Sequence, residues 1–263
     1  MASTDRSSRL LDDLAGGVRT VHAWLGNLAD ASDLAEVPTV LPGWSVAVLV
    51  AHLGTMVEGT VTTLGRPTRE RPMPLSAYLR AYAPHADEID ARERARAAGK
   101  ELPTLLAELA SAGEALATMI NSKLPPTVLA PRGPLRLPDF LNTRVVELVV
   151  HADDLHRSLG GDPVRLGRRL EGGACRTLAA ALAEENPGQT LEVRVPPHAA
   201  VQCGFAGDGP THTRGTPPNV VETDPATFLR LATGRLTWAG ARTDGTVRAS
   251  GVRADLTSML PVL

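Results

Sequence analysis

The sequence lacks the features that mark membrane-bound, secreted and nucleic-acid-binding proteins. No apolar run approaches the roughly 20 residues needed to cross a bilayer. The polar first ten residues lack the apolar core of a signal peptide. The 27 basic and 29 acidic residues are interspersed and leave a formal net charge of −2. These absences predict a cytoplasmic protein with no membrane and no nucleic-acid partner.

Cysteine is almost absent as well. Cys175 and Cys203 lack the short spacing of a metal-binding or redox pair, so we interpret both as reduced structural thiols. The motifs of serine hydrolases, phosphate-binding loops and dinucleotide-binding folds are missing, so those chemistries have no support. The 263 residues, of which 43% are hydrophobic, are enough for one large or two ordinary globular domains.

The first 160 residues carry the periodicity of long helices. Apolar residues three or four positions apart predict an amphipathic helix over about residues 11–28. A nearly all-apolar segment follows, which Ser45 can cap and which predicts a buried helix to about Leu64. These helices and the later ones predict a helical bundle. The later helices are expected over about residues 76–98, 103–121 and 138–159.

Two segments of this bundle are predicted to lie outside its core. The charged run over residues 87–96 interleaves opposite charges, and we interpret it as a solvated helix face. Residues 125–138 contain five prolines, which predict an extended connection without regular structure.

The pattern changes after residue 163 and predicts a smaller α/β domain. The expected organisation is a helical domain over residues 1–163 and an α/β domain over residues 164–263. Asp224 and Pro225 are expected to open a helix, since they suit its N-cap and first position. The remaining expectations are a turn-rich segment over 204–219, strands over 190–195, 219–223 and 246–251, and a last helix over 253–261.

Residues 144–155 (RVVELVVHADDL) contain the first candidate site. Arg144, Glu147, His151 and Asp154 are three or four residues apart, so they share a stripe beside the apolar one. Valine and leucine flank Glu147 and His151, and both are therefore expected to be buried. A buried carboxylate needs a partner. That partner is either Arg144 or His151 in an ion pair, or a cation that Glu147 and His151 bind together.

His52 adds a third ligating group, because it lies in the middle of the otherwise apolar helix that follows Ser45. Two histidines and one carboxylate leave an open coordination position on zinc, which is typical of catalytic rather than structural sites. We therefore predict that His52, Glu147 and His151 bind Zn²⁺ or another divalent metal.

The same segments resemble motifs of a known family. Residues 41–53 (LPGWSVAVLVAHL) are similar to the first motif of the DinB-like, mycothiol-dependent maleylpyruvate isomerase family, in which a buried histidine follows a Pro-Gly-Trp-Ser/Thr opening. Residues 144–155 are similar to its second motif, and residues 233–256 resemble its sterol-carrier-like C-terminal domain. The resemblance implies an up-down four-helix bundle before a small α/β domain, with the metal ligands at His52, Glu147 and His151.

The resemblance also implies a reaction. Coordination to zinc deprotonates a thiol, so mycothiol would act as a thiolate cosubstrate on a small electrophilic substrate. In a maleylpyruvate-type isomerisation the thiolate adds to the cis double bond, and rotation and loss of the thiolate give the trans isomer. If the adduct is kept, the enzyme is an S-transferase. The motif positions make Arg235 and Arg248 candidates for binding an anionic substrate. We predict that Asp154, one helical turn from His151, orients a ligand or Arg144.

Two other functions fit the same residues. A non-catalytic protein would hold a small molecule or lipid in the C-terminal domain, with the histidines and the glutamate as a structural remnant. A metal-dependent hydrolase would use water where the isomerase uses a thiol. Metal content distinguishes the non-catalytic binding protein, which would be metal-free, from the isomerase. Substrate tests distinguish the hydrolase from the isomerase.

Overall fold

The structure, a computed structural model, describes residues 2–28, 34–205 and 218–263. The chain forms two compact units, one of Met1–Pro74 with Ala81–Leu170 and the other of Leu75–Arg80 with Glu171–Leu263. A helical N-terminal region followed by a small α/β region confirms the predicted fold class. The domain boundary between residues 163 and 164 stays a prediction, and most of the turn-rich segment 204–219 lies outside the described residues.

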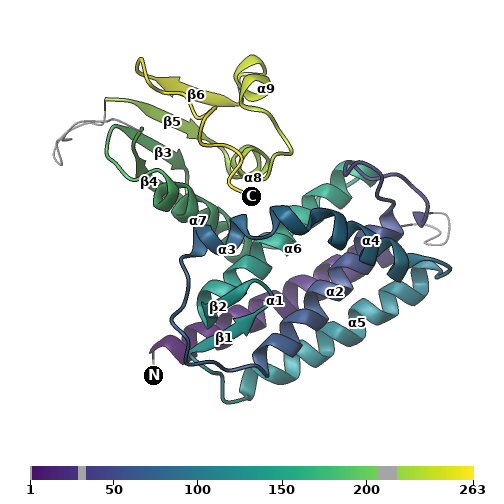
Figure 1. Ribbon diagram of the computed structural model, residues 1–263. Helices are drawn as coiled ribbons and strands as arrows, with labels where there is room; N and C mark the ends of the chain where they lie inside the picture. Colours follow the sequence, from purple (N-terminus) through teal and green to yellow (C-terminus); the bar gives the residue numbers. More distant parts are fainter. Residues whose placement is uncertain (1, 29–33, 206–217) are drawn as a thin grey trace. The chain divides into compact units, whose positions relative to one another are not determined.

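The first unit is built on a four-helix bundle (Figure 1). Helices α5 and α6 each pack against both α1 and α2. The apolar stripe predicted for the first helix is buried, with every residue from Leu11 to Leu25 of that stripe at most 1% exposed. A short 3-10 helix, η3 (Met119–Asn121), extends α5. The four helices are α1 (Ala2–Gly26), α2 (Val46–Leu64), α5 (Leu102–Thr118) and α6 (Leu137–Leu159).

Helix α2 is the central apolar helix of this bundle. Its 19 residues are long and apolar enough to cross a membrane, but 72% of its most apolar window is buried inside the protein. A core helix passes the same test, so the composition of α2 reflects its place in the bundle. Ser45 occupies the predicted N-cap position, although its side chain makes no capping hydrogen bond.

The single helix predicted over residues 76–98 is wrong, because the chain breaks there. It forms α3 (Leu75–Arg80), a 3-10 turn η2 (Ala83–His85) and α4 (Ala86–Ala97). Pro84 lies in the turn, and proline has no N–H to continue the helical hydrogen bonding. Helix α4 packs against α2 in the first unit. Helix α3 belongs to the second unit, where the Ser76 N–H donates to the Glu184 carboxylate.

The extended connection predicted for residues 125–138 is also wrong. It contains an antiparallel hairpin of β1 (Thr127–Ala130) and β2 (Gly133–Arg136). Pro134 lies within β2 opposite Leu129. A two-stranded ribbon has only edge strands, and an edge strand tolerates proline. The hairpin leads directly into α6 and therefore helps to fix the start of the helix that carries two predicted metal ligands.

In its described residues, the second unit contains a four-stranded sheet and three helices in addition to α3. Its strand order is β4-β3-β5-β6, with β3 antiparallel to β4 and parallel to β5, and β5 antiparallel to β6. The three predicted strands correspond to β3 (Leu191–Val195), β5 (Val220–Thr223) and β6 (Val247–Ser250). The elements that were not predicted are β4 (Ala199–Cys203), α7 (Arg168–Glu185) and α9 (Trp238–Thr243).

The helix predicted at Asp224 and Pro225 is confirmed as α8 (Pro225–Ala232). The Asp224 carboxylate caps it by accepting a hydrogen bond from the Thr227 N–H. The helix predicted over residues 253–261 is absent, because that segment forms only turns. There the Asp255 carboxylate accepts from the Thr257 N–H, a local bond that competes with helix formation.

Two adjacent glycines of α1 test the packing of the bundle. A Cβ at Gly17 would lie 2.6 Å from Leu148 Cδ2 and 2.7 Å from Leu170 Cδ1, whereas the nearest atom to a Cβ at Gly16 lies 3.7 Å away. Alanine is the better helix former, so Gly16→Ala should raise the free energy of unfolding by about 0.5–1 kcal/mol. Gly17→Ala should instead lower it by about 1 kcal/mol, because overpacking two buried leucines outweighs that gain.

Urea denaturation followed by circular dichroism measures both variants, with Gly16→Ala as the matched control. Equal stabilisation by the two substitutions would contradict the close contact at Gly17.

Candidate metal centre

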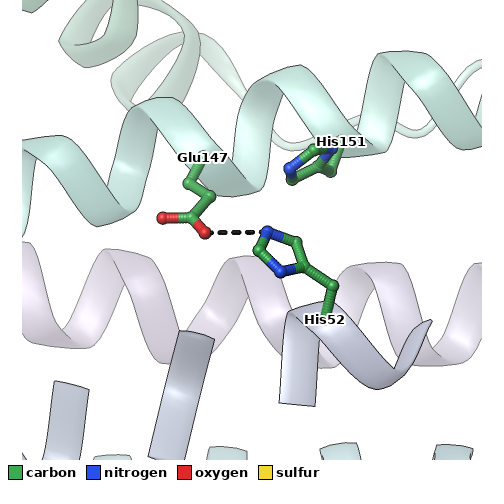
Figure 2. Close-up of side chains that lie close together, drawn as sticks. All are labelled: His52, Glu147 and His151. Carbon is green, nitrogen blue, oxygen red and sulfur yellow. Dashed lines mark ion pairs between the residues drawn. The ribbon is translucent and has the colours of Figure 1, made fainter. Parts of the chain in front are cut away.

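Helices α2 and α6 bring the three predicted ligands together (Figure 2). His52 Nε2 lies 2.9 Å from Glu147 Oε1. The ring centroids of His52 and His151 are 4.9 Å apart, with the rings nearly perpendicular. One ligand atom from each of the three residues lies within 4.8 Å of those from the other two. In the described parts of the chain, this is the one such group of metal-ligating side chains.

The three side chains are shielded from solvent without being sealed from it. The exposed fraction of the side chain is 11% for His52, 18% for Glu147 and 11% for His151. Electrostatic interactions are stronger in such a setting than in water. The site can therefore hold a charged group more tightly than an exposed site could.

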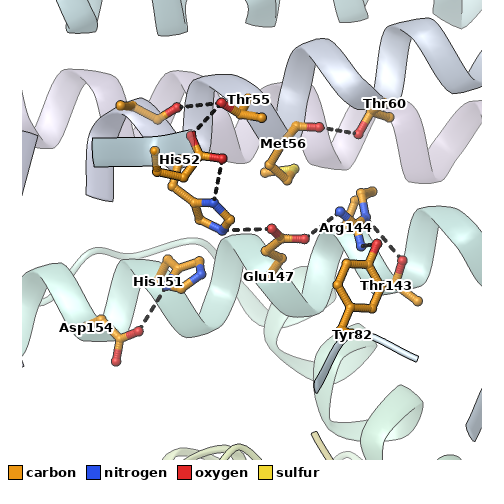
Figure 3. A network of polar contacts seen from close by, with 12 residues as sticks. His52, Thr55, Met56, Thr60, Tyr82, Thr143, Arg144, Glu147, His151 and Asp154 are labelled. Carbon is orange, nitrogen blue, oxygen red and sulfur yellow. Dashed lines mark hydrogen bonds and ion pairs between the residues drawn. The ribbon is translucent and has the colours of Figure 1, made fainter. Parts of the chain in front are cut away.

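Glu147 uses its two carboxylate oxygens differently (Figure 3). Oε1 faces His52, and Oε2 lies 2.6 Å from Arg144 Nη1. Burial raises the pKa of Glu147, but the charge of Arg144 and the hydrogen bond from His52 together lower it to about 2. The carboxylate is thus ionised, as a metal ligand must be. Glu147 pairs with Arg144, one of the ion-pair partners predicted from the sequence, and cation binding by Glu147 and His151 stays a prediction.

Arg144 is itself fixed by the surrounding side chains. Its Nη2 donates to the Tyr82 hydroxyl at 3.1 Å, and its Nε donates to Thr143 Oγ1 at 3.1 Å (Figure 3). Its guanidinium also lies over the rings of Tyr82 and Phe140. These contacts fix the Arg144 guanidinium, which pairs with Oε2 of Glu147. Oε1 of Glu147 is therefore the oxygen that faces the histidines.

His52 lies between two carboxylates. Its Nε2 faces Glu147, and its Nδ1 lies 3.6 Å from Glu93 Oε1. Burial lowers the pKa of His52, but hydrogen bonding to Glu147 and the nearby Glu93 carboxylate raise it to about 9. The ring of Trp44 packs edge-on at a centroid distance of 5.2 Å. The Trp44 indole N–H donates to Asp90 at 2.6 Å, which fixes that ring in turn.

His151 has a buried acidic partner on its own helix. Its Nδ1 lies 3.0 Å from Asp154 Oδ2, and Asp154 has no exposed side-chain surface (Figure 3). With Nδ1 engaged in this way, Nε2 is the nitrogen for a metal. Asp154 is therefore placed as expected for a residue that orients His151, although its role in a reaction stays a prediction.

Comparison with known proteins places the chain in a family. The profile of the mycothiol maleylpyruvate isomerase N-terminal domain matches residues 5–156, and that of the bacterial SCP ortholog domain matches residues 167–262. The chain belongs to the mycothiol maleylpyruvate isomerase family. No curated protein matches the sequence significantly.

Two solved structures share the fold of this family member. They are the mycothiol-dependent maleylpyruvate isomerase and a histidine-to-alanine mutant of it, with TM-scores of 0.57 and 0.58. Each is 18% identical in sequence, and each alignment covers 95% of both chains. At this identity the likeness concerns the fold alone.

The donor set of this mycothiol maleylpyruvate isomerase family member fits a divalent metal. Two imidazoles and one carboxylate are the ligands of many catalytic zinc sites, in which a fourth position takes water or substrate. The Nδ1 atom of each histidine faces a carboxylate, and such contacts orient the ring for metal binding. The observed convergence of ligand atoms is therefore consistent with a bound ion.

The two predicted C-terminal arginines of this family member lie in its second unit. Arg235 follows α8, and its Nη1 donates to the Thr233 carbonyl at 2.9 Å. Arg248 is exposed on β6, opposite Glu222 of β5. The contact of either arginine with a substrate stays a prediction.

Sequence reasoning missed Glu93. The charged run of α4 was interpreted as a solvated face, yet the Glu93 side chain is completely buried. Residues Ile89 and Ala97, four positions to either side, share its helix face, and Ala97 is buried as well. This apolar spacing was the available signal, and the dense charges around it obscured it.

The charge state of His52 makes zinc binding dependent on pH. Because the pKa of His52 is raised to about 9 in the metal-free protein, zinc must displace a proton at neutral pH. The Kd for zinc should therefore fall by about ninefold between pH 7 and 8, close to the tenfold limit for one displaced proton, and level off above the His52 pKa. Competition titration against a chelator of known pH dependence measures this. A Kd that stays constant across this range would contradict the assigned protonation state.

Proposed function

We propose that this protein is a metal-dependent enzyme that uses mycothiol to isomerise a small electrophilic substrate, as the name of its family indicates. The observation that carries the proposal is the convergence of His52, Glu147 and His151 between α2 and α6. The match to the mycothiol maleylpyruvate isomerase N-terminal domain, which spans all three residues, supports it independently.

The protein's own residues would prepare the site for a thiol. A divalent ion bound there would lower the pKa of a thiol ligand, so that the thiol binds as a thiolate. His52 and His151 would hold that ion through Nε2, and Glu147 would hold it through Oε1 while Arg144 retains Oε2. Asp154 would keep His151 in the tautomer that presents Nε2. The low exposure of these side chains would limit competition from water.

The buried cysteines favour an external thiol. Burial raises the pKa of Cys175 to about 12 and that of Cys203 to about 11. Neither thiol is ionised to a useful extent at neutral pH, and neither has exposed surface. A thiolate for the reaction would therefore come from a low-molecular-weight compound such as mycothiol.

Maleylpyruvate is the substrate that we propose to test first, because the family and both solved neighbours carry its name. Addition of a thiolate converts its cis double bond into a single bond, which can rotate. Loss of the thiolate from the rotated form gives the trans isomer and regenerates the thiol. The carboxylates of such a substrate are suitable partners for Arg235 and Arg248. Retention of the adduct would make the reaction an S-transfer at the same site.

Metal content and activity should depend on the same residues. We expect about one zinc per chain in the wild-type protein, and isomerisation only when mycothiol is present. His52→Ala and Glu147→Ala should each lose the metal and reduce activity by more than about 100-fold. His85→Ala is the control, because His85 is an exposed histidine that pairs with Glu88. Elemental analysis and the absorbance change of maleylpyruvate measure the two quantities.

Three outcomes would contradict the proposal. Wild-type protein without metal, even after reconstitution, would favour a non-catalytic binding protein. Isomerisation at full rate without a thiol would exclude the thiol mechanism. Full metal occupancy in His52→Ala would overturn the assignment of that ligand.

A further inference from the structure

Glu93 is a buried carboxylate beside the metal centre, on a helix that supplies none of the three ligands. It lies on α4, and its side chain has no exposed surface. An ionised carboxylate is costly to bury unless charged or hydrogen-bonding partners surround it. Glu93 has such partners. Oε1 accepts from Arg92 Nε and Nη2 at 2.9 and 2.7 Å, and Oε2 accepts from the Thr55 hydroxyl at 2.7 Å.

The Glu93 carboxylate faces the side of His52 opposite the metal centre. His52 Nε2 points to Glu147, whereas Nδ1 lies 3.6 Å from Glu93 Oε1. Nδ1 is buried and makes no hydrogen bond within the described residues. An imidazole that gives its Nε2 lone pair to a metal carries its proton on Nδ1, and this proton requires an acceptor. A shift of a few tenths of an ångström would bring Glu93 Oε1 into hydrogen-bonding distance of Nδ1.

The same arrangement occurs at the other histidine. His151 Nδ1 is 3.0 Å from Asp154, which is also completely buried. The two carboxylates come from different parts of the fold, since Asp154 is on the ligand helix α6 and Glu93 is on α4. Each histidine of the centre therefore has one buried carboxylate at Nδ1 and directs its other nitrogen to the ligand cluster.

Ion pairs hold Glu93 in this position. Thr55, which donates to Glu93, accepts a hydrogen bond from Arg96 Nη1 at 3.0 Å. Arg96 in turn pairs with Glu58 of α2 at 2.6 Å and Glu108 of α5 at 3.2 Å. Arg96 thus links α4 to two helices of the bundle, whereas Arg92 and Thr55 hold the Glu93 carboxylate by direct contact.

We propose that Glu93 is a positioning residue of the metal centre, which accepts a hydrogen bond from the Nδ1–H of His52 and so directs Nε2 of that ring at the metal. This inference rests on the proposed metal site and adds a residue from a third helix to it. It gives α4 a role in positioning a metal ligand, which the charged sequence of this helix does not suggest. Asp154 would serve His151 in the same way, so that the two buried carboxylates fix both imidazole ligands.

The test compares Glu93→Ala and Glu93→Gln with the wild type and with Glu108→Gln as the matched control. Glu108 belongs to the same ion-pair network but contacts Arg96 and Lys100 rather than a ligand. We expect the Kd for zinc to rise about 10- to 100-fold in Glu93→Ala and less in Glu93→Gln, whose amide oxygen can still accept a hydrogen bond from His52 Nδ1. Glu108→Gln should stay within about twofold of the wild type.

The visible spectrum of the cobalt-substituted proteins reports the ligand geometry directly. Its bands should change in Glu93→Ala and remain unchanged in Glu108→Gln, a difference that a general loss of stability would not produce. Thermal unfolding identifies a variant that fails to fold, and the isosteric Glu93→Gln keeps the test valid in that case.

Each contrary outcome identifies what has failed. If both Glu93 variants match the wild type in zinc Kd and cobalt spectrum, Glu93 does not position His52 and the proposed metal site stands. If Glu108→Gln weakens zinc binding as much as Glu93→Ala, the effect belongs to the ion-pair network and the inference is overturned. If the wild-type protein binds no zinc, the proposed function fails and the inference fails with it.

Discussion

The contact between α2 and α6 places an imidazole beside a carboxylate inside an apolar bundle, and the surrounding polar groups compensate the cost of burying them. Arg144 neutralises Glu147, and Tyr82 and Thr143 hold Arg144 in place. Asp154 is hydrogen-bonded to Nδ1 of His151, and the Glu93 carboxylate lies 3.6 Å from Nδ1 of His52. In the metal-free protein the two carboxylates raise the pKa of His52 to about 9, which favours an ion pair with Glu147. A divalent ion would replace the His52 proton and use the same three ligand atoms.

The two units of the chain contribute different chemical groups. The bundle supplies the three predicted ligands of the candidate metal centre, and the hairpin of β1 and β2 leads into the helix that carries Glu147 and His151. The α/β unit has two thiols, but both are buried and their pKa values are raised. Neither cysteine of the chain has exposed surface, so a thiolate acting at the candidate centre would have to come from another molecule. An external thiol fits this combination.

Much of the site follows from the sequence because helical spacing is a strong local constraint. The four-residue separation of Glu147 and His151 places them on one face of α6, and a histidine inside an apolar helix must lie in the core. The rest depends on tertiary contacts. Glu93 lies in a run of charges that resembles an exposed surface, and only the packing of α4 on α2 buries it. The hairpin was missed because prolines in residues 125–138 suppress the strand signal, although an edge strand accepts Pro134.

The most direct test of the account is a crystal structure of the zinc-loaded protein with anomalous data collected on both sides of the zinc absorption edge. The account predicts a single strong anomalous peak between α2 and α6, about 2.0–2.2 Å from His52 Nε2, a Glu147 oxygen and His151 Nε2. A peak at another place, or zinc bound without His52, would contradict it. Retention of the 2.9 Å contact between His52 Nε2 and Glu147 Oε1 in zinc-soaked crystals, with no peak beside it, would show that the three residues are an ion-pair cluster only.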